Sequence, residues 1–441
     1  MIEQAKTIFR AGVEAVDPQQ LIDQYCTLKD GEFTIRDTSF DLSSIEDVWV
    51  VGFGKASARM AYALEKLLGN YVSGGVVITK YGHQLPCKTV KIREAAHPVP
   101  DERGVEATKE LMHLLEQTSS RDLVITLISG GGSALLVDVP SEATLKDLML
   151  ANDLLTKSAA SIHEINTVRK HLSTLKGGQL GRAIYPAQGL SLILSDVLGD
   201  ELSVIASGPT VADDSTFSQA VAILQEYHLW EKFPNSLKEL LREGVEGRRQ
   251  ETPKKEALSL QQMQNVLLGS NRMALEACQA KAEELGFQVK ILTYEFSGET
   301  HESMEQLWQQ LQREMGSLRK EARKQPICFL LGGETTLNVR GDGLGGRNQH
   351  RALLAAELIQ GDHSWTILSA GTDGTDGPTD AAGAVVNGTT VQVLQKEGKE
   401  LSQYKEAFDS YTYFKDSAFH MITGPTYTNV MDLIVAVNNG Q

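Results

Sequence analysis

The sequence predicts an α/β protein built mostly from parallel sheets. Short apolar runs rich in β-branched residues, such as VWVVGF (48–53) and LVITLI (123–128), have the length of buried strands rather than of helices. A glycine-rich turn and a segment of helical periodicity follow, as at 54–69, where apolar residues return on one face and Gly69 suits the helix end. Strands that alternate with helices in this way favour parallel pairing.

The same succession of strand, turn and helix recurs along 441 residues, a length that suggests two or three domains at roughly 100–200 residues each. The charged segment 241–259 has few apolar residues and separates two such series. We therefore expect an N-terminal α/β domain over 1–250 and a C-terminal α/β domain over 251–441. The other predicted strands are VVIT (76–79), LSLILS (190–195), NVLLG (265–269), QVKILTY (288–294), ICFLLGG (327–333) and WTILSAG (365–371).

Composition excludes several classes of function. A net charge of −15 argues against a nucleic-acid-binding surface. No stretch approaches the roughly 20 apolar residues that span a bilayer, and residues 1–16 carry acids and lack an apolar signal core. The four cysteines are scattered, which is typical of reduced thiols. We expect a cytoplasmic protein without a membrane segment, and the sequence leaves open whether it forms homo-oligomers.

Glycine-rich turns follow the predicted strands, where open parallel sheets bind their ligands. In GFGKAS (52–57), Gly52, Gly54 and Ser57 allow a tight turn into a helix whose N-terminus attracts phosphate. Lys55 adds a positive charge where the helix dipole favours an anion, although an ordinary exposed lysine is the alternative. The turn predicts a phosphate-binding element with Lys55 as its charged group.

SGGGSALL (129–136) is the most glycine-dense turn and follows a buried strand. Successive free backbone N–H groups can form a nest that binds phosphate or carboxylate, although a plain loop is the alternative. The spacing fits neither a P-loop nor a G-x-S-x-G nucleophile turn. The predicted anion-binding residues are Ser129, Gly130, Gly131, Gly132 and Ser133.

Two further candidates lie between residues 165 and 200. Arg169 and Lys176 are basic groups near the end of a predicted helix in INTVRKHLSTLKGGQLGRA (165–183). They could bind the substrate, or could merely complement the helix dipole. Asp196 stands immediately beyond the strand 190–195, where an acid is well placed to bind Mg²⁺ or to take a hydroxyl proton.

The C-terminal half carries charged residues in its own glycine-rich turns. Glu334 follows the strand ICFLLGG, and Arg347 and Asn348 begin a helix after GDGLGGR. We assign Glu334 and Asn348 to substrate or phosphate binding, and Arg347 to stabilising the charge of a transferring phosphoryl group. Asp373 follows the strand WTILSAG and is a candidate Mg²⁺ ligand with Asp196, although aspartates in such turns often bond their own backbone.

A dinucleotide-binding reading fits less well. Ser57 takes the place of the third glycine in G-x-G-x-x-G, and Lys80 stands after VVIT where an acid would bind the ribose. A lysine there could bind the 2′-phosphate of NADP, so the missing acid argues against NAD binding more than against NADP binding.

Together these motifs resemble the glycerate 2-kinase family, whose members have often been labelled hydroxypyruvate reductase. The match covers most of the chain and rests on GFGKAS, HPVPDERG, SGGGSALL, INTVRKHLSTLKGGQLG, LSDVLGDELSVIASGPT, GGETT, GDGLGGRNQ, SAGTDGTDGPTDAAGAVV and TGPTYTNVMDL. The resemblance implies two Rossmann-like α/β/α domains with the active site in the interdomain cleft. It also implies ATP and Mg²⁺ as cofactors, and D-glycerate phosphorylated to 2-phospho-D-glycerate.

Carried over by motif, Lys55 and Arg347 are the principal catalytic groups and Asp196 is the base or metal partner. SGGGS would hold a phosphate or the substrate carboxylate. Tyr427 departs from the pattern, because the family is expected to have glycine there. An NAD(P)H-dependent hydroxypyruvate reductase and a non-catalytic binder of phosphorylated metabolites are the alternatives.

Overall fold

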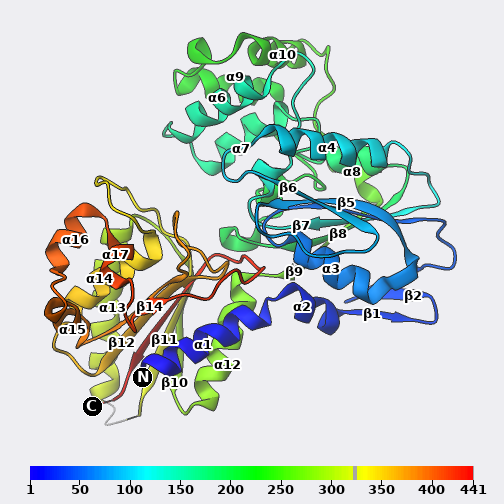
Figure 1. Cartoon of the computed structure of the whole chain (residues 1–441). Helices are drawn as coiled ribbons and strands as arrows, with labels where there is room; N and C mark the ends of the chain where they lie inside the picture. Colours follow the sequence, from blue (N-terminus) through cyan, green and yellow to red (C-terminus); the bar gives the residue numbers. More distant parts are fainter. Residues whose placement is uncertain (321–324, 441) are drawn as a thin grey trace. The chain divides into compact units, whose positions relative to one another are not determined.

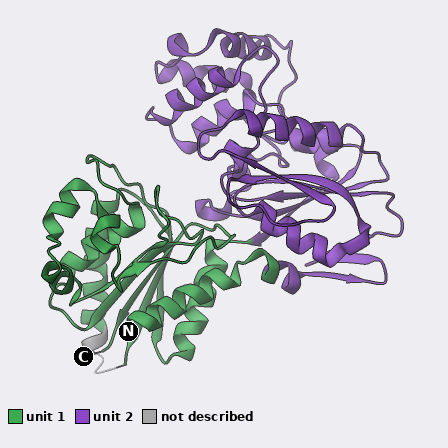
Figure 2. Cartoon of the chain, in the orientation of Figure 1, with its two compact units in different colours: residues 1–20, 269–441 green, residues 21–268 purple. Residues whose placement is uncertain are grey.

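The computed structural model describes residues 1–320 and 325–440 and divides the chain into two compact units (Figure 2). One comprises Met1–Gln20 with Gly269–Gln441, and the other comprises Leu21–Leu268. We call them unit 1 and unit 2. The division differs from the expected border between residues 250 and 251, because unit 2 extends to Leu268 and the N-terminal helix belongs to unit 1. No helix in the described ranges is both long and apolar enough to cross a bilayer.

Unit 2 is built on a six-stranded sheet in the order β6-β5-β4-β7-β8-β9 (Figure 1). The four pairings from β6 to β8 are parallel, as the sequence predicted. β5 and β6 follow β4 on one side and β7 and β8 lie on its other side, so the strand order reverses between β4 and β7. Such a switch point is where open α/β sheets bind ligands. The strands are β4 (Val48–Phe53), β5 (Val72–Lys80), β6 (Val90–Ala95), β7 (Leu123–Ile128), β8 (Gln188–Leu194) and β9 (Met263–Gly269).

Helices and a small sheet complete unit 2. A separate apolar cluster, which includes Leu155, Val168, Leu224 and Leu241, holds a group of four helices together. These are α6 (Leu145–Thr156), α7 (Ile162–His171), α9 (Phe217–Glu226) and α10 (Asn235–Val245) (Figure 1). The antiparallel strands are β1 (Cys26–Lys29), β2 (Glu32–Ile35) and β3 (Thr38–Asp41), and the remaining helices are α3 (Ser57–Leu68), α4 (Glu102–Leu115), α5 (Gly132–Leu135), α8 (Gln179–Ile184) and α11 (Leu258–Gln261). Helix α2 (Pro18–Tyr25) contains the border between the two units, which falls after Gln20.

Unit 1 has a mixed six-stranded sheet in the order β10-β11-β15-β12-β13-β14. β10 and β11 are parallel, but β15 pairs antiparallel with both β11 and β12, and β13 is antiparallel to β12. The expectation of mostly parallel pairing is therefore wrong for this sheet, because the last strand inserts between two strands that precede it. The strands are β10 (Gln288–Phe296), β11 (Ile327–Gly333), β12 (Trp365–Gly371), β13 (Gly383–Asn387), β14 (His420–Met421) and β15 (Asp432–Asn438).

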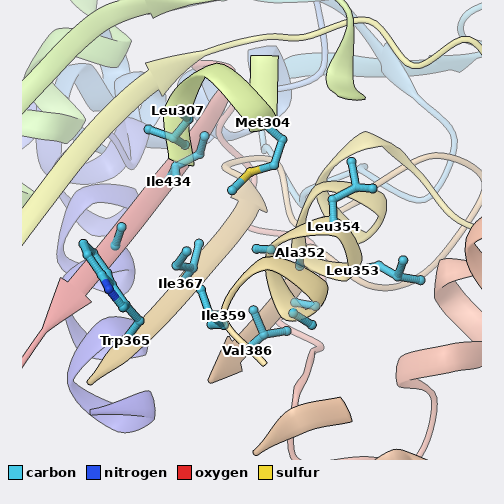
Figure 3. Packing of buried hydrophobic residues seen from close by; sticks show 14 of the residues in the cluster. Met304, Leu307, Ala352, Leu353, Leu354, Ile359, Trp365, Ile367, Val386 and Ile434 are labelled. Atoms are coloured by element: carbon cyan, nitrogen blue, oxygen red, sulfur yellow. The ribbon is translucent and has the colours of Figure 1, made fainter. Parts of the chain in front are cut away.

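Alternate residues of this sheet face helices on its two sides. Ile434 and Trp365 pack in one cluster with Met304 and Leu307 of α13 (Thr300–Lys320) (Figure 3). On the opposite face the Cys278 thiol of α12 (Asn271–Glu284) donates a hydrogen bond to the Ile8 carbonyl of α1 (Ile2–Ala15) at 3.3 Å. This packing explains why the N-terminal helix belongs to unit 1. The other helices are α14 (Arg347–Leu358), α15 (Thr390–Lys396), α16 (Leu401–Ala407) and α17 (Ser410–Phe414).

Candidate functional site

The two glycine-rich turns of unit 2 lie against each other at the switch point of its sheet. The Lys55 N–H donates to the Gly130 carbonyl at 2.9 Å, and the Ala56 N–H donates to Ser129 Oγ at 3.0 Å. Gly54 has φ +129° and lies so close to Ser129 that a Cβ on it would collide with the serine. The structure therefore brings GFGKAS and SGGGS into one surface, as their positions after neighbouring strands predicted.

Lys55 and His97 converge on the middle of the SGGGS turn. A Cβ on Gly131 would lie 2.7 Å from His97 Nε2 and 3.4 Å from Lys55 Cγ. Both Lys55 and Gly131 are partly exposed. A partly exposed cation beside a glycine turn gives an arrangement that can hold a phosphate or a carboxylate. No paired histidine spacing marks His97 in the sequence.

Two predicted ligand residues of the first turn, Gly52 and Ser57, make close contacts within the fold. Ser57 is fully buried, and its hydroxyl contacts the carbonyls of Gly54 at 2.7 Å and Ile78 at 2.9 Å. A Cβ on Gly52 would lie 2.7 Å from the Leu127 carbonyl oxygen, so this glycine allows β4 to pair closely with β7. These contacts favour a structural role for Gly52 and Ser57, and their assignment to phosphate binding stays a prediction.

Ser133 joins a short chain of polar side chains behind the second turn. Its hydroxyl lies 3.0 Å from Ser207 Oγ, and the Ser207 hydroxyl donates to Asn166 Oδ1 at 3.0 Å. Gly132 packs on the same segment, since a Cβ there would lie 2.8 Å from Ala206 Cβ. Ala206 and Ser207 of the LSDVLGDELSVIASGPT motif therefore pack against the SGGGS turn.

The basic residues of the α7 region have partners within unit 2. Lys176 is 7% exposed, and its ammonium donates to the Leu136 carbonyl at 2.9 Å and to Asp138 Oδ1 at 3.2 Å. Arg169 donates to Asn152 Oδ1 at 2.8 Å, and burial lowers the pKa of its guanidinium. These environments favour structural roles for Lys176 and Arg169, and their assignment to substrate binding stays a prediction. Asp196 is partly exposed just beyond the carboxyl end of β8, where the sequence placed it.

In unit 1 the centre of the candidate site is an arginine between two carboxylates. Arg347 Nε and Nη2 donate to the two oxygens of Asp432 at 2.7 and 2.9 Å, and its Nη1 lies 2.7 Å from Glu334 Oε1. The Asp432 side chain is 1% exposed and that of Glu334 is 44% exposed. Burial would lower the pKa of Arg347, but Asp432 and Glu334 outweigh it and raise the pKa. Arg347 is therefore permanently charged, at the ends of strands β11 and β12.

Asp432, the buried partner of Arg347, was not among the residues predicted from the sequence. It begins β15 and pairs with Gly333 at the end of β11 and with Gly371 at the end of β12. Burial would raise its pKa, but the Arg347 guanidinium holds the pKa below its usual range. In the sequence, Asp432 is marked only by its position directly before the apolar run LIVAVN, within the motif TGPTYTNVMDL.

Asn348 and Asp376 hold the start of α14. Asp376 accepts the backbone N–H of Asn348 at 3.0 Å and that of Gln349 at 2.8 Å, so an internal carboxylate occupies the helix N-terminus. Burial raises the pKa of Asp376. Asn348 is 1% exposed, and its Oδ1 accepts from Ser369 Oγ at 2.7 Å and Arg351 Nη1 at 3.1 Å. Asn348 thus orients side chains within the fold, and its contact with substrate stays a prediction.

Asp373 lies at the carboxyl end of β12 and is 8% exposed. Its Oδ1 accepts the Thr375 N–H and hydroxyl, both at 3.0 Å, which is the turn geometry that the sequence left as an alternative. Among the described residues no three His, Cys, Asp or Glu side chains cluster as a metal site. Mg²⁺ in kinases is usually held by one or two carboxylates and by nucleotide phosphates, so single carboxylates such as Asp373 and Asp196 fit that donor set.

The fold and these turns define a two-unit α/β protein whose candidate anion-binding groups lie at the carboxyl ends of strands. Two family models match the chain: a domain of unknown function (DUF4147) over residues 4–242, and the MOFRL family over residues 327–432. The chain is 40% identical to a glycerate 2-kinase of Pyrococcus horikoshii, covering 96% of this chain and 94% of that protein. It belongs to the glycerate 2-kinase family.

A solved structure and another relative extend the comparison. The crystal structure of glycerate kinase (EC 2.7.1.31) from Thermotoga maritima matches with a TM-score of 0.83 and 38% identity, covering 99% of both chains. A relative from Agrobacterium vitis bears the name putative hydroxypyruvate reductase and is 39% identical over 87% of this chain and 85% of its own length. The two names correspond to the two enzymatic readings of the sequence.

Proposed function

We propose that the chain transfers the γ-phosphoryl group of ATP to the 2-hydroxyl of D-glycerate, giving 2-phospho-D-glycerate and ADP. The observation that carries this proposal is the guanidinium of Arg347, which the buried Asp432 holds at the ends of β11 and β12. Preorganised arginines stabilise the negative charge of a transferring phosphoryl group. The similarity to named glycerate kinases along nearly the whole chain supports the substrate pair.

The proposed roles follow from the chemistry of each side chain. Lys55 and Arg347 stabilise the oxygens of the phosphoryl group in the transition state. Asp196 accepts the proton of the substrate hydroxyl as it attacks. The backbone N–H groups of residues 129–133 bind a phosphate or the glycerate carboxylate. Asp373 and Asp196 would contact Mg²⁺, which would supply positive charge to neutralise the nucleotide phosphates.

The reductase alternative has less support in the residues. The GFGKAS turn, which follows β4, packs directly against β7 and the SGGGS turn, and its Ser57 is buried. Lys80 stands at the end of β5, where an acid would bind the ribose of NAD. These features leave NAD without a recognisable ribose ligand, and Lys80 would suit only the 2′-phosphate of NADP.

Two parallel assays separate the alternatives. With MgATP and D-glycerate we expect stoichiometric ADP formation, followed through a coupled assay that reports ADP. With hydroxypyruvate and NADH or NADPH, without ATP, we expect no oxidation of the nicotinamide. Nicotinamide oxidation without ADP formation would establish the reductase. Thermal stabilisation by 2-phosphoglycerate with no turnover in either assay would establish a non-catalytic binder.

A further inference from the structure

Arg347 is held by a two-point contact whose geometry is specific. Its Nε and Nη2 donate to the two carboxylate oxygens of Asp432 at 2.7 and 2.9 Å. Two parallel hydrogen bonds between a planar guanidinium and a planar carboxylate fix the orientation of the arginine as well as its position. The pair lies at an end of the sheet where the Asp432 side chain is 1% exposed, so water competes weakly for these bonds.

Asp432 is itself fixed from three sides. Its backbone pairs with Gly333 on one neighbouring strand and with Gly371 on the other. Its Oδ2 lies 3.8 Å from Nη2 of Arg351, a second arginine that is 1% exposed. Arg351 is held in turn by Ser369 Oγ at 2.9 Å and by Asn348 Oδ1 at 3.1 Å. Strand pairing therefore fixes the backbone of Asp432, and a carboxylate that turned away would lose its contacts with Arg347 and Arg351.

We propose that Asp432 is the positioning residue for Arg347, a role that rests on the proposed phosphoryl transfer. The contact with Asp432 occupies the Nε side of the guanidinium, so the Nη1 end is the part that meets the phosphoryl oxygens. In the structure this end contacts Glu334 Oε1 at 2.7 Å, a carboxylate on a half-exposed side chain that an incoming anion can replace. Asp432 acts through Arg347 and makes no contact with the substrate.

Asp432→Asn removes the charge while keeping the shape of the side chain. The amide NH₂ would face an arginine N–H group, so one of the two hydrogen bonds is lost and the guanidinium is free to rotate. Misplacement of a catalytic group by about 1 Å costs on the order of 10²-fold in rate. We expect kcat to fall by about that factor, with a much smaller change in the KM for ATP and for D-glycerate.

A double-mutant cycle distinguishes positioning from general damage. If Asp432 acts through Arg347, adding Asp432→Asn to Arg347→Ala should change kcat by no more than about twofold. The matched control is Asp213→Asn, which alters a buried carboxylate of unit 2 that accepts a hydrogen bond from Lys170. Its effect on kcat should add to that of Arg347→Ala. A further fall of about 10²-fold when Asp432→Asn is added to Arg347→Ala would overturn the proposal.

Chemical rescue tests the same role without altering Asp432. In Arg347→Ala, free guanidinium ion below denaturing concentrations should bind Asp432 and restore part of the lost turnover, whereas sodium ion at equal ionic strength should not. Absence of rescue would contradict the proposal, even if Asp432→Asn fails to fold. Wild-type enzyme that makes no ADP from D-glycerate would refute the proposed function. Normal wild-type turnover with an additive cycle would refute the positioning role alone.

Discussion

Replacing Gly131 by alanine should slow turnover far more than it destabilises the fold. Gly131 has φ +79°, a conformation that costs an alanine about 1–2 kcal/mol. The added Cβ would also lie 2.7 Å from His97 Nε2, about 0.7 Å short of an ordinary contact of 3.4 Å. The histidine or the SGGGS turn must therefore shift by that amount beside Lys55. A shift of this size at a catalytic site predicts a fall in kcat/KM of about 10- to 100-fold.

Gly82 provides a matched control for this substitution. It has φ +76°, and a Cβ there would meet nothing within 4 Å, so Gly82→Ala carries the backbone cost without the collision. We expect both variants to lose a similar free energy of unfolding in urea titrations, and only Gly131→Ala to lose ADP formation. Equal kcat/KM for the two variants would show that the SGGGS turn can move freely and does not position the reacting groups.

Three further predictions concern charged side chains. Lys55→Ala should lower kcat in the ADP assay by about 10²–10³, the usual cost of losing one preorganised charge, and near-normal turnover would remove Lys55 from the mechanism. Glu334→Gln should lower the KM for ATP by up to about fivefold, because the ion pair of Glu334 with Arg347 competes with the incoming anion. The limit of about fivefold follows because a half-exposed ion pair contributes about 1 kcal/mol or less. A raised KM would mean that Glu334 binds substrate instead. His350 is buried beside His301, and burial, followed by His301, lowers its pKa to about 4. Its contribution to stability is complete above the unfolded pKa of about 6.5 and is lost as the pH falls from 6.5 to about 4. The stability of wild type relative to His350→Gln should therefore decrease by about 3 kcal/mol between pH 7 and pH 4 in unfolding titrations. A difference that stays constant with pH would show that the pKa of His350 is not lowered.

The local elements of this fold could be predicted because strand and helix signals are local. The buried strands β4, β7, β11 and β12 coincide with apolar runs in the sequence, and the turns after them carry most of the candidate site. The φ of +58° at Tyr427 explains why glycine is expected at this position, since glycine adopts that conformation at little cost, but it does not explain the tyrosine.

The pairing of distant segments could not be predicted from the same signals. Nothing in the order of the chain shows that β15 inserts antiparallel between β11 and β12, and this insertion is what places Asp432 against Arg347. The buried partner of Lys176 is equally hidden, because Asp138 lies 38 positions away in the chain. Basic residues at a helix end look alike in sequence whether they face a ligand or a buried carboxylate.

The proposed function is transfer of the γ-phosphoryl group of ATP to the 2-hydroxyl of D-glycerate, with Arg347 at the strand ends stabilising the charge of that group. NMR identification of the phosphoglycerate formed from MgATP and D-glycerate tests it most directly, with authentic 2- and 3-phosphoglycerate as standards. We expect 2-phosphoglycerate as the product, in amounts equal to the ADP released. Formation of 3-phosphoglycerate, or ADP release without a phosphorylated acid, would contradict it.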